Sequence, residues 1–209
     1  MWIHVNTMHR ILLQLVFVVY GSFVHSDSFF PTVGLNNVKL THAIEFPDPP
    51  DPSLTFDEEG PDGFPAYGLH PGSSVAVPYS DRFPPTFHPE FSITTTAKLK
   101  SPHGGFLFAV VDGTNKTVEL GLELTPMGPG SSKITLYYTD PSIHSQSQPI
   151  ASFQVASDFK DWTRIGLAVS KSEVALYFNC DKSGAVSVAR EPESLQFDPH
   201  STLFLGQAG

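Results

Sequence analysis

The sequence has a single cysteine, Cys180, in 209 residues. One thiol cannot build an intrachain disulfide framework, which excludes the bridge-stapled folds of small secreted domains. Basic residues are also few, since Lys and Arg number 12 against 21 Asp and Glu. The acidic excess is concentrated in residues 27–90, where ten acids accompany two bases. This balance argues against nucleic-acid or heparin binding over the whole surface and leaves room only for a local basic patch.

The motifs of common catalytic and cofactor sites are missing as well. The chain has no H-E-x-x-H, no G-x-S-x-G, no Walker lysine loop and no dinucleotide glycine pattern. No pair of histidines shows zinc-ligand spacing. Asp112 in "VVDGTNK" fits a turn-forming Asp-Gly better than a calcium ligand. We therefore predict no catalytic residue, no metal site and no cofactor.

Two carboxylates invite a separate test, because jelly-roll glycosidases use paired acids that face one cleft. Glu119 and Glu123 lie four residues apart in the alternating stretch "TVELGLEL". Val118 and the three leucines of this stretch are predicted to face inward, and both glutamates outward. We interpret the pair as the solvated side of an amphipathic strand.

Long hydrophobic runs are absent except for one near the N-terminus, "ILLQLVFVVYGSFV". It is shorter than a membrane span, which needs about 20 residues, and it follows a short polar lead. Val24 and Ser26 suit the −3 and −1 positions of a signal-peptidase site. Residues 1–26 are therefore predicted to be a signal peptide, and an uncleaved signal anchor is the alternative. Secretion without a membrane span follows.

Strand patterns dominate the rest of the chain, and helix signals are nearly absent. "EFSITTTAKLK" alternates apolar and polar residues, which is typical of a strand with one wet face. "GGFLFAVV" is apolar on both sides and is predicted to be a central strand. "DWTRIGLAVSKSEVALYFNC", residues 161–180, predicts a hairpin that turns at Lys171 and Ser172. Several short strands that recur about every 8–12 residues predict an all-β antiparallel sandwich.

One domain is predicted over residues 27–209, within which residues 45–65 are rich in proline and acids and show no periodicity. We interpret this stretch as a long exposed loop, with a domain boundary near residue 65 as the alternative. Two residues suggest covalent modification. Asn115 begins the only N-x-[ST] sequon, on a predicted turn, and N-glycosylation is expected there.

Cys180 is the second such residue. The alternation of the hairpin places it on the apolar stripe of Val174, Leu176 and Phe178, as a small buried hydrophobe or half of a buried disulfide. In an oxidising compartment, a lone thiol implies an intermolecular bond, a free thiol or a missing partner.

The order of these stretches resembles the thrombospondin N-terminal-like form of the laminin G domain. More narrowly, it is similar to the N-terminal non-collagenous domain of the multiplexin collagens, types XV and XVIII. The most specific pieces are "LFAVVD", "LYYTDP", "WTRIGLAVS" followed by "ALYFNC", and the closing "LFLGQAG". The resemblance covers about residues 31–209 and implies a concanavalin-like jelly roll of two antiparallel sheets.

The resemblance also gives Cys180 a role, as half of a disulfide whose mate lies beyond the "LFLGQAG" strand. On this interpretation the chain stops at Gly209, before its last strand and before the partner cysteine, as a truncated gene model or an isoform fragment would. A homotrimer is expected only if a collagenous region follows.

The function that the resemblance implies is that of a non-catalytic module of the basement-membrane matrix, contributing to matrix organisation and adhesion. Matrix proteins, cell-surface receptors and glycosaminoglycans are the expected partners, with Lys98 and Lys100 as a weak glycosaminoglycan contact. The alternatives are a secreted jelly-roll lectin or glycan-active enzyme, and a thrombospondin-type secreted protein without a collagen part.

Overall fold

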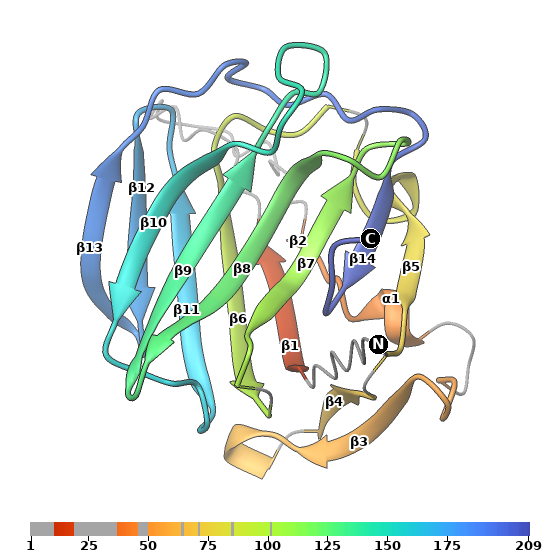
Figure 1. Ribbon diagram of the computed structural model, residues 1–209, viewed down its shortest axis with the longest axis vertical. Coiled ribbons are helices and arrows are strands. Elements are labelled where there is room, and N and C mark those ends of the chain that lie inside the picture. The colour runs from red at the N-terminus through yellow and green to blue at the C-terminus, as the bar shows by residue number, and fades with distance from the viewer. Residues whose placement is uncertain are drawn as a thin grey trace, which may run out of the picture.

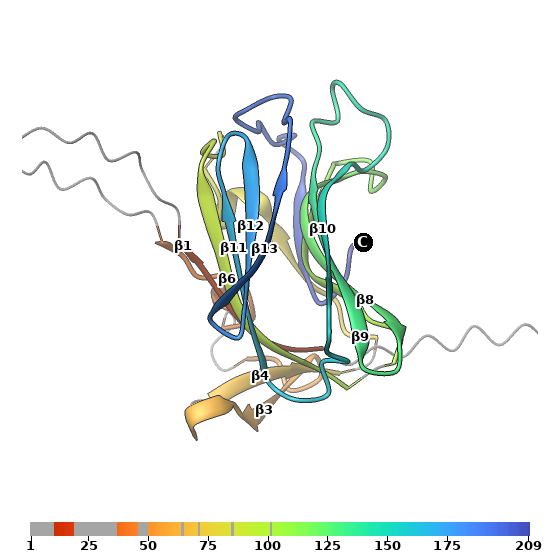
Figure 2. The ribbon, with the colours of Figure 1, turned by 90° about the vertical axis from the view of Figure 1, so that its left-hand side faces the viewer.

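A computed structural model describes residues 11–18, 37–45, 50–63, 65–70, 72–84, 86–100 and 102–209. Two antiparallel sheets face each other across one core, as Figure 2 shows nearly edge-on. Helical structure among the described residues is limited to α1 (His42–Glu45) and the 3-10 turns η1 (Pro61–Gly63) and η2 (Tyr79–Asp81). The prediction of an antiparallel two-sheet jelly roll is confirmed.

The larger sheet has the strand order β13-β12-β11-β6-β1-β4-β3, and β2 pairs with β1 beside this path (Figure 1). Its strands are β1 (Ile11–Val18), β2 (Asn37–Val38), β3 (Thr55–Glu59), β4 (Pro65–Leu69), β6 (Phe91–Leu99), β11 (Thr163–Val169), β12 (Glu173–Phe178) and β13 (Asp181–Ser187).

The smaller sheet has the order β10-β9-β8-β7-β14-β5. Its strands are β5 (Val75–Pro78), β7 (Gly105–Val111), β8 (Val118–Gly128), β9 (Ser131–Tyr138), β10 (Pro149–Val155) and β14 (Thr202–Leu205). β7 lies between β8 and β14, and the four residues from Leu107 to Val110 are fully buried. The interpretation of "GGFLFAVV" as a central strand is therefore confirmed.

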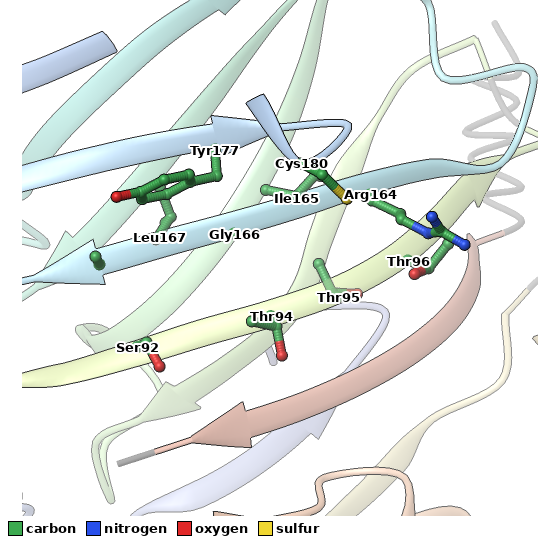
Figure 3. A pocket seen from close by; sticks show the side chains of 11 residues that line it. Ser92, Thr94, Thr95, Thr96, Arg164, Ile165, Gly166, Leu167, Tyr177 and Cys180 are labelled. Carbon is green, nitrogen blue, oxygen red and sulfur yellow. The ribbon is translucent and has the colours of Figure 1, made fainter. Parts of the chain in front are cut away.

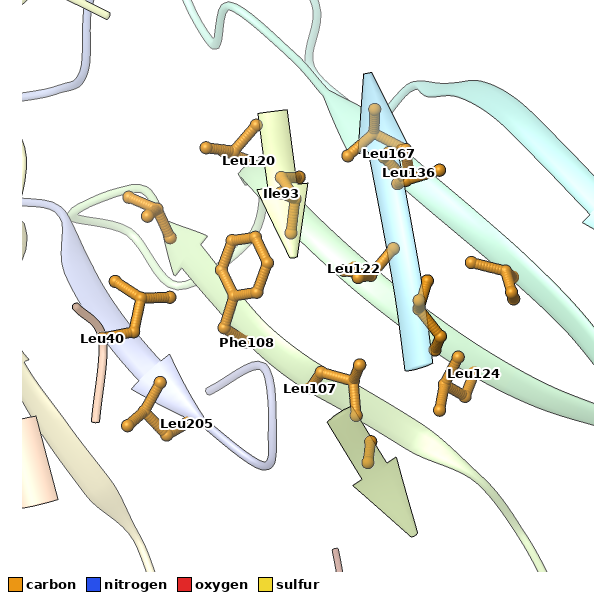
Figure 4. Packing of buried hydrophobic residues seen from close by; sticks show 14 of the residues in the cluster. Leu40, Ile93, Leu107, Phe108, Leu120, Leu122, Leu124, Leu136, Leu167 and Leu205 are labelled. Atoms are coloured by element: carbon orange, nitrogen blue, oxygen red, sulfur yellow. The ribbon is translucent and has the colours of Figure 1, made fainter. Parts of the chain in front are cut away.

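The core fills the space between the sheets with alternate residues of each strand (Figure 4). Phe91, Ile93 and Leu99 of β6 point inward, as the alternation of that stretch predicts. Leu120, Leu122 and Leu124 of β8 face them from the smaller sheet. A ring cluster closes one end of the core, where Phe83, Phe87, Phe91 and Phe197 meet with centroids 4.7 to 5.8 Å apart. Such tilted and edge-to-face pairs stabilise a core beyond simple burial.

A second, smaller apolar cluster lies on the outer side of the smaller sheet. It consists of Ala109, Val111, Val118 and Phe204, with Phe106, Tyr137 and Ala208 packed against it. The inward position predicted for Val118 is therefore wrong. The pairing of β7 with β8 shifts register between Val110 and Val111, and this irregularity turns Val118 to the other face.

The acidic, proline-rich stretch at 45–65 is not a loop throughout. Residues 55–59 form β3, which pairs with β4 from Thr55↔Leu69 to Glu59↔Pro65. The sequence "TFDEE" does not reveal this strand, because Thr55 is its only buried residue and Asp57 and Glu59 are exposed. The described residues place this hairpin at the end of the larger sheet and show no domain boundary near residue 65 (Figure 1).

Residues 11–18 of the predicted signal peptide form β1, which lies between β6 and β4. Eight residue pairs join it to β6, from Ile11↔Leu99 to Val18↔Ser92. The predicted cleavage point after Ser26 lies outside the described residues and stays a prediction. No described helix is long and apolar enough to cross a membrane.

Candidate functional site

An open groove of about 600 Å³ crosses the outer face of the larger sheet, over β6, β11 and β12 (Figure 3). Its floor carries the outward residues of β6, Ser92, Thr94 and Thr96. Gly166 of β11 contributes bare backbone to the groove, and its neighbour in the pairing register is Tyr177. Tyr177 is 39% exposed and its ring forms one wall.

The other wall of the groove is formed by Arg164 and Cys180 (Figure 3). The amide of Arg164 donates to Oδ1 of Asn179 at 3.0 Å, and the amide of Asn179 donates to the carbonyl of Arg164 at 2.8 Å. These bonds fix the β12–β13 turn against β11. The groove as a whole combines one cation, an aromatic ring and hydroxyl groups, which suits the binding of a polar ligand or a protein surface.

Cys180 is exposed, so its predicted place on the buried stripe is wrong. The apolar alternation holds through Val174 and Leu176 and ends with β12 at Phe178. Asn179 and Cys180 then adopt φ values of 50° and 76°. Two consecutive left-handed residues make the tight turn that suits the twist of a hairpin, and this turn carries the thiol away from the core. No disulfide partner for Cys180 exists among the described residues, which contain no other cysteine.

A second cluster of polar groups lies at the rim of the smaller sheet. The carboxylate of Asp112 accepts hydrogen bonds from the amides of Lys116 and Thr117, at 2.8 and 3.0 Å, and from the hydroxyl of Thr114 at 2.7 Å. Burial acts to raise the pKa of Asp112, but these hydrogen bonds outweigh it and the pKa is lowered. The carboxylate is thus occupied by its own turn, as the turn interpretation predicts.

Glu119 lies beside this turn and is completely buried, so its predicted solvated position is wrong. Its carboxylate accepts hydrogen bonds from the amide of Asp198 at 2.9 Å and from the hydroxyl of Ser201. Burial raises the pKa of Glu119 to about 7, although these two hydrogen bonds lower it. The segment at 198–201 covers the outward side of β8, which the local sequence pattern of β8 does not reveal.

Glu123, the second glutamate of this strand, has a different environment from Glu119. It is half-buried and accepts a hydrogen bond from the hydroxyl of Tyr137 at 2.9 Å. Glu119 is enclosed by a chain segment, so the two carboxylates do not face one cleft. Among the described residues, no group of three or more His, Cys, Asp or Glu side chains could hold a metal ion.

Lys98 and Lys100, the predicted basic pair, converge on one acid of the β3–β4 hairpin. Lys98 Nζ lies 3.7 Å from Glu58 Oε1, and Lys100 forms a shorter ion pair with Glu58 Oε2. Lys98 also lies 6.0 Å from the ring centre of Trp162, and Lys100 lies 5.4 Å from that of Phe56. The β3–β4 hairpin, which the sequence pattern does not predict, therefore places one negative charge, that of Glu58, beside the two positive charges of this pair.

Asn115 lies in the β7–β8 turn with a φ of 55° and is exposed. Asparagine tolerates this left-handed conformation better than most residues. The described structure therefore leaves the side chain open to solvent, where a glycan could be accommodated without disturbing the core.

The described residues define a jelly-roll sandwich of the laminin G-like class, with an open groove on the outer face of its larger sheet. Similarity to a collagen chain, together with this fold, supports a thrombospondin N-terminal-like, laminin G-like domain. It is 32% identical over 162 residues to the human collagen alpha-1(XVIII) chain, covering 78% of this chain and 9% of that one. The chain thus spans about a tenth of the length of this curated relative.

Two further comparisons concern family models and solved structures. No family model matches the sequence. Among solved structures, domains LG4-5 of the mouse laminin alpha1 chain are similar with a TM-score of 0.40 and 10% identity, over 63% of this chain and 31% of that one. This likeness adds nothing to the strand topology already described.

Proposed function

We propose that this chain is a secreted, non-catalytic interaction module of the extracellular matrix. The observation that carries the proposal is the 32% identity to a collagen chain over 78% of this sequence. The more specific role, as the N-terminal non-collagenous part of a basement-membrane collagen that supports adhesion, belongs to the same proposal. The groove beside Tyr177 offers hydroxyl groups, an arginine and an aromatic ring for recognition. No acid and base that could act together in catalysis line it among the described residues.

The direct test is to express the tagged chain in matrix-forming animal cells and to measure its partition between medium and insoluble matrix. We expect the wild type in the matrix fraction and a loss of at least half of it for Tyr177→Ser, which removes the exposed ring of the groove. Ile143→Ser is the matched control, because Ile143 is 51% exposed on a different surface. Equal matrix fractions for both variants would remove the groove from the proposal. A chain that stays entirely in the medium would contradict the matrix role itself.

A weak glycosaminoglycan contact at Lys98 and Lys100 is the second part of the proposal. Glu58 competes with a sulfated polymer for both ammonium groups. Glu58→Gln should therefore delay elution from heparin, whereas Glu173→Gln, which frees the single exposed lysine Lys182 elsewhere, should have less effect. Surface ion contacts are largely screened near physiological salt, where the Debye length is about 8 Å. Heparin retention that is insensitive to the Glu58 change would remove these lysines from the contact.

Covalent modification of the secreted chain is the third part. We propose N-glycosylation at Asn115 and a disulfide from Cys180 to a cysteine outside this sequence. Asn115→Gln should abolish the mass loss that peptide N-glycosidase causes, and a wild type without such a loss would contradict the glycan. A longer chain that carries the next cysteine should melt higher than this one, with the gain lost under reductant. Equal melting temperatures would contradict the bridge.

A further inference from the structure

The segment over the carboxyl group of Glu119 is a short loop held at both ends by the core. Residues 198–201, called the cover loop below, lie between Phe197 and Leu203, which are both buried in the core between the sheets. The outer side of the loop faces solvent, because the side chain of His200 is 86% exposed. The cover loop therefore has fixed ends and a solvent-facing middle.

Hydrogen bonds to Glu119 close the cover loop over β8. The amide of Asp198 donates to the Glu119 carboxyl group at 2.9 Å, and the hydroxyl of Ser201 donates to the other oxygen of this group. The neighbouring elements β9 and η2 contribute main-chain contacts. The amide of Thr139 donates to the carbonyl of Glu119 at 2.7 Å, and the amide of Tyr79 donates to the carbonyl of Ser201 at 3.2 Å. One carboxyl group thus holds a donor at each end of the loop.

The charged groups around this carboxyl group are mainly acids. Asp198 on the cover loop and Asp112 on the β7–β8 turn both act to raise the pKa of Glu119. Lys116 of the same turn acts on Asp112, and His200 Nδ1 lies 3.5 Å from Asp198 Oδ1. Among the described residues, no basic side chain forms an ion pair with Glu119. An ionised Glu119 would therefore be a buried anion with acidic neighbours and no counter-ion.

The cover loop also rests directly on the β7–β8 turn. A Cβ atom at Gly113 would lie 2.7 Å from the Cβ of His200 and 3.2 Å from Oδ1 of Asp198. Loop and turn therefore meet without a side chain between them. Movement of the loop would uncover this turn, which carries Asn115, together with the outward side of β8.

Ionisation of Glu119 disfavours the closed loop. A carboxylate that is buried without a cation is unfavourable, and hydration removes most of this penalty. Complete unfolding would hydrate the group, but local openings expose less core and cost less free energy. A displacement of four residues between two fixed ends is the smallest movement that admits water to the carboxylate.

We propose that the cover loop is a pH-dependent switch, closed over protonated Glu119 and opened by ionisation of this group. The open form is rare at mildly acidic pH and more frequent at neutral pH, so the rim of the smaller sheet presents a different surface in the two conditions. The switch requires neither secretion nor the matrix role. Its failure and the failure of the proposed function can therefore be told apart.

The size of the effect follows from proton linkage. The pKa of Glu119 is about 7 in the closed form, against 4.5 for the hydrated group. The ratio of open to closed loop depends on how readily each form releases the proton. This ratio should therefore rise about 60-fold from pH 5.0 to pH 7.5.

The test is amide hydrogen exchange of the full chain, measured by NMR at pH 5.0 and 7.5 and at several low urea concentrations. Rates are corrected for the intrinsic pH dependence of exchange. The amides of Asp198 and Ser201 report on the cover loop, and those of β11 are the reference. We expect the loop amides to open about 60-fold more often at the higher pH. Their opening should be insensitive to urea, whereas β11 should open less often and in proportion to urea.

Two results for the wild type would overturn the proposal. The first is an opening ratio of the loop amides that changes less than about 3-fold between the two pH values. The second is loop exchange with the protection and the urea dependence of β11, because the loop would then open only when the whole domain unfolds.

Three variants identify the titrating group. Glu119→Gln should reduce the pH effect on the loop amides to less than about 3-fold. Glu123→Gln on the same strand should retain the full effect. His200→Gln should retain it as well, and this control is needed because histidine side chains can change charge in this pH range. A full effect in Glu119→Gln, or its loss in His200→Gln, would contradict the role of Glu119.

A further variant and a direct titration cover the case in which Glu119→Gln does not fold. Asp198→Asn removes a neighbouring negative charge and keeps the side-chain oxygen that accepts from the amide of His200. It should reduce the pH effect, and an unchanged or larger effect would count against the mechanism. The carboxyl carbon of Glu119 in the wild type, followed by NMR, should titrate near pH 7. A midpoint near 4.5 would overturn the proposal.

Discussion

The carboxyl group of Glu119 gives the sharpest prediction, because burial raises its pKa from 4.5 to about 7. The folded state then holds a proton that the unfolded chain releases between these two pH values. Its contribution to stability is therefore fully present below pH 4.5 and is lost as the pH rises through about 7. One pKa unit corresponds to about 1.4 kcal/mol, so the loss amounts to about 3 kcal/mol.

The perturbation is Glu119→Gln, which stays neutral at every pH. The amide oxygen can accept from the amide of Asp198, and the amide nitrogen can donate to the hydroxyl of Ser201, so both contacts of the carboxyl group have a replacement. Urea unfolding at pH 5.0 and 7.5, analysed by linear extrapolation, gives the free energy of unfolding of each chain. The advantage of Glu119→Gln over the wild type should increase by about 2.4 kcal/mol from pH 5.0 to pH 7.5, because part of the full loss falls outside this range.

Two variants make this measurement specific. Glu123→Gln removes a charge from the same strand and should leave the pH slope of the wild type in place. Ser201→Ala removes a hydrogen bond that lowers the pKa of Glu119, so it should cost more stability at pH 7.5 than at pH 5.0. A constant difference between Glu119→Gln and the wild type over this range would refute the reasoning.

Three further changes test the packing of the fold. Arg190 is buried and donates to the carbonyls of Pro89, Ser170 and Glu193. Arg190→Ala should therefore lower the free energy of unfolding by about 3 kcal/mol in urea titrations. A loss below about 1 kcal/mol would contradict this role. Gly104 has a φ of +71°, and a Cβ there would lie 2.1 Å from the carbonyl oxygen of Leu124. Gly104→Ala should therefore lower Tm by several degrees in calorimetry, since left-handed strain alone costs about 1–3 kcal/mol. Cys180→Ser at the exposed turn should leave the unfolding free energy within about 0.5 kcal/mol, and a larger loss would point to a buried thiol.

Local periodicity was sufficient to predict most of the sandwich. The alternation in β6 and β11 and the apolar run of β7 each report a strand and its buried side within a few residues. The same reasoning fails where distant segments meet. Glu119 is a polar residue in an alternating strand, which predicts exposure to solvent, yet residues 198–201 cover it. The pairing of Lys98 and Lys100 with Glu58 likewise depends on a hairpin about forty positions earlier in the sequence.

Turn chemistry explains the error at Cys180. An alternating pattern predicts that a strand continues for as long as apolar and polar residues alternate. It therefore places Cys180 on the apolar stripe. Backbone conformation ends the strand first, because Asn179 and Cys180 adopt left-handed angles. An asparagine at the first position of a two-residue turn is the available sequence signal, and the residue after it is rarely a cysteine. The groove beside Tyr177 also depends on the pairing register of β11 and β12, which alternation alone does not fix.

The exposed turn at Asn179 and Cys180 has a practical consequence. The only thiol of the chain stands at a hairpin tip, outside the core and at the border of the groove. A fluorophore or spin label attached there would report on ligands entering the groove without disturbing the packing between the sheets. The same atom could serve as the attachment point for pulling on the β12–β13 hairpin. The residue that first suggested a missing bond therefore gives this domain a built-in, site-specific handle for measurement.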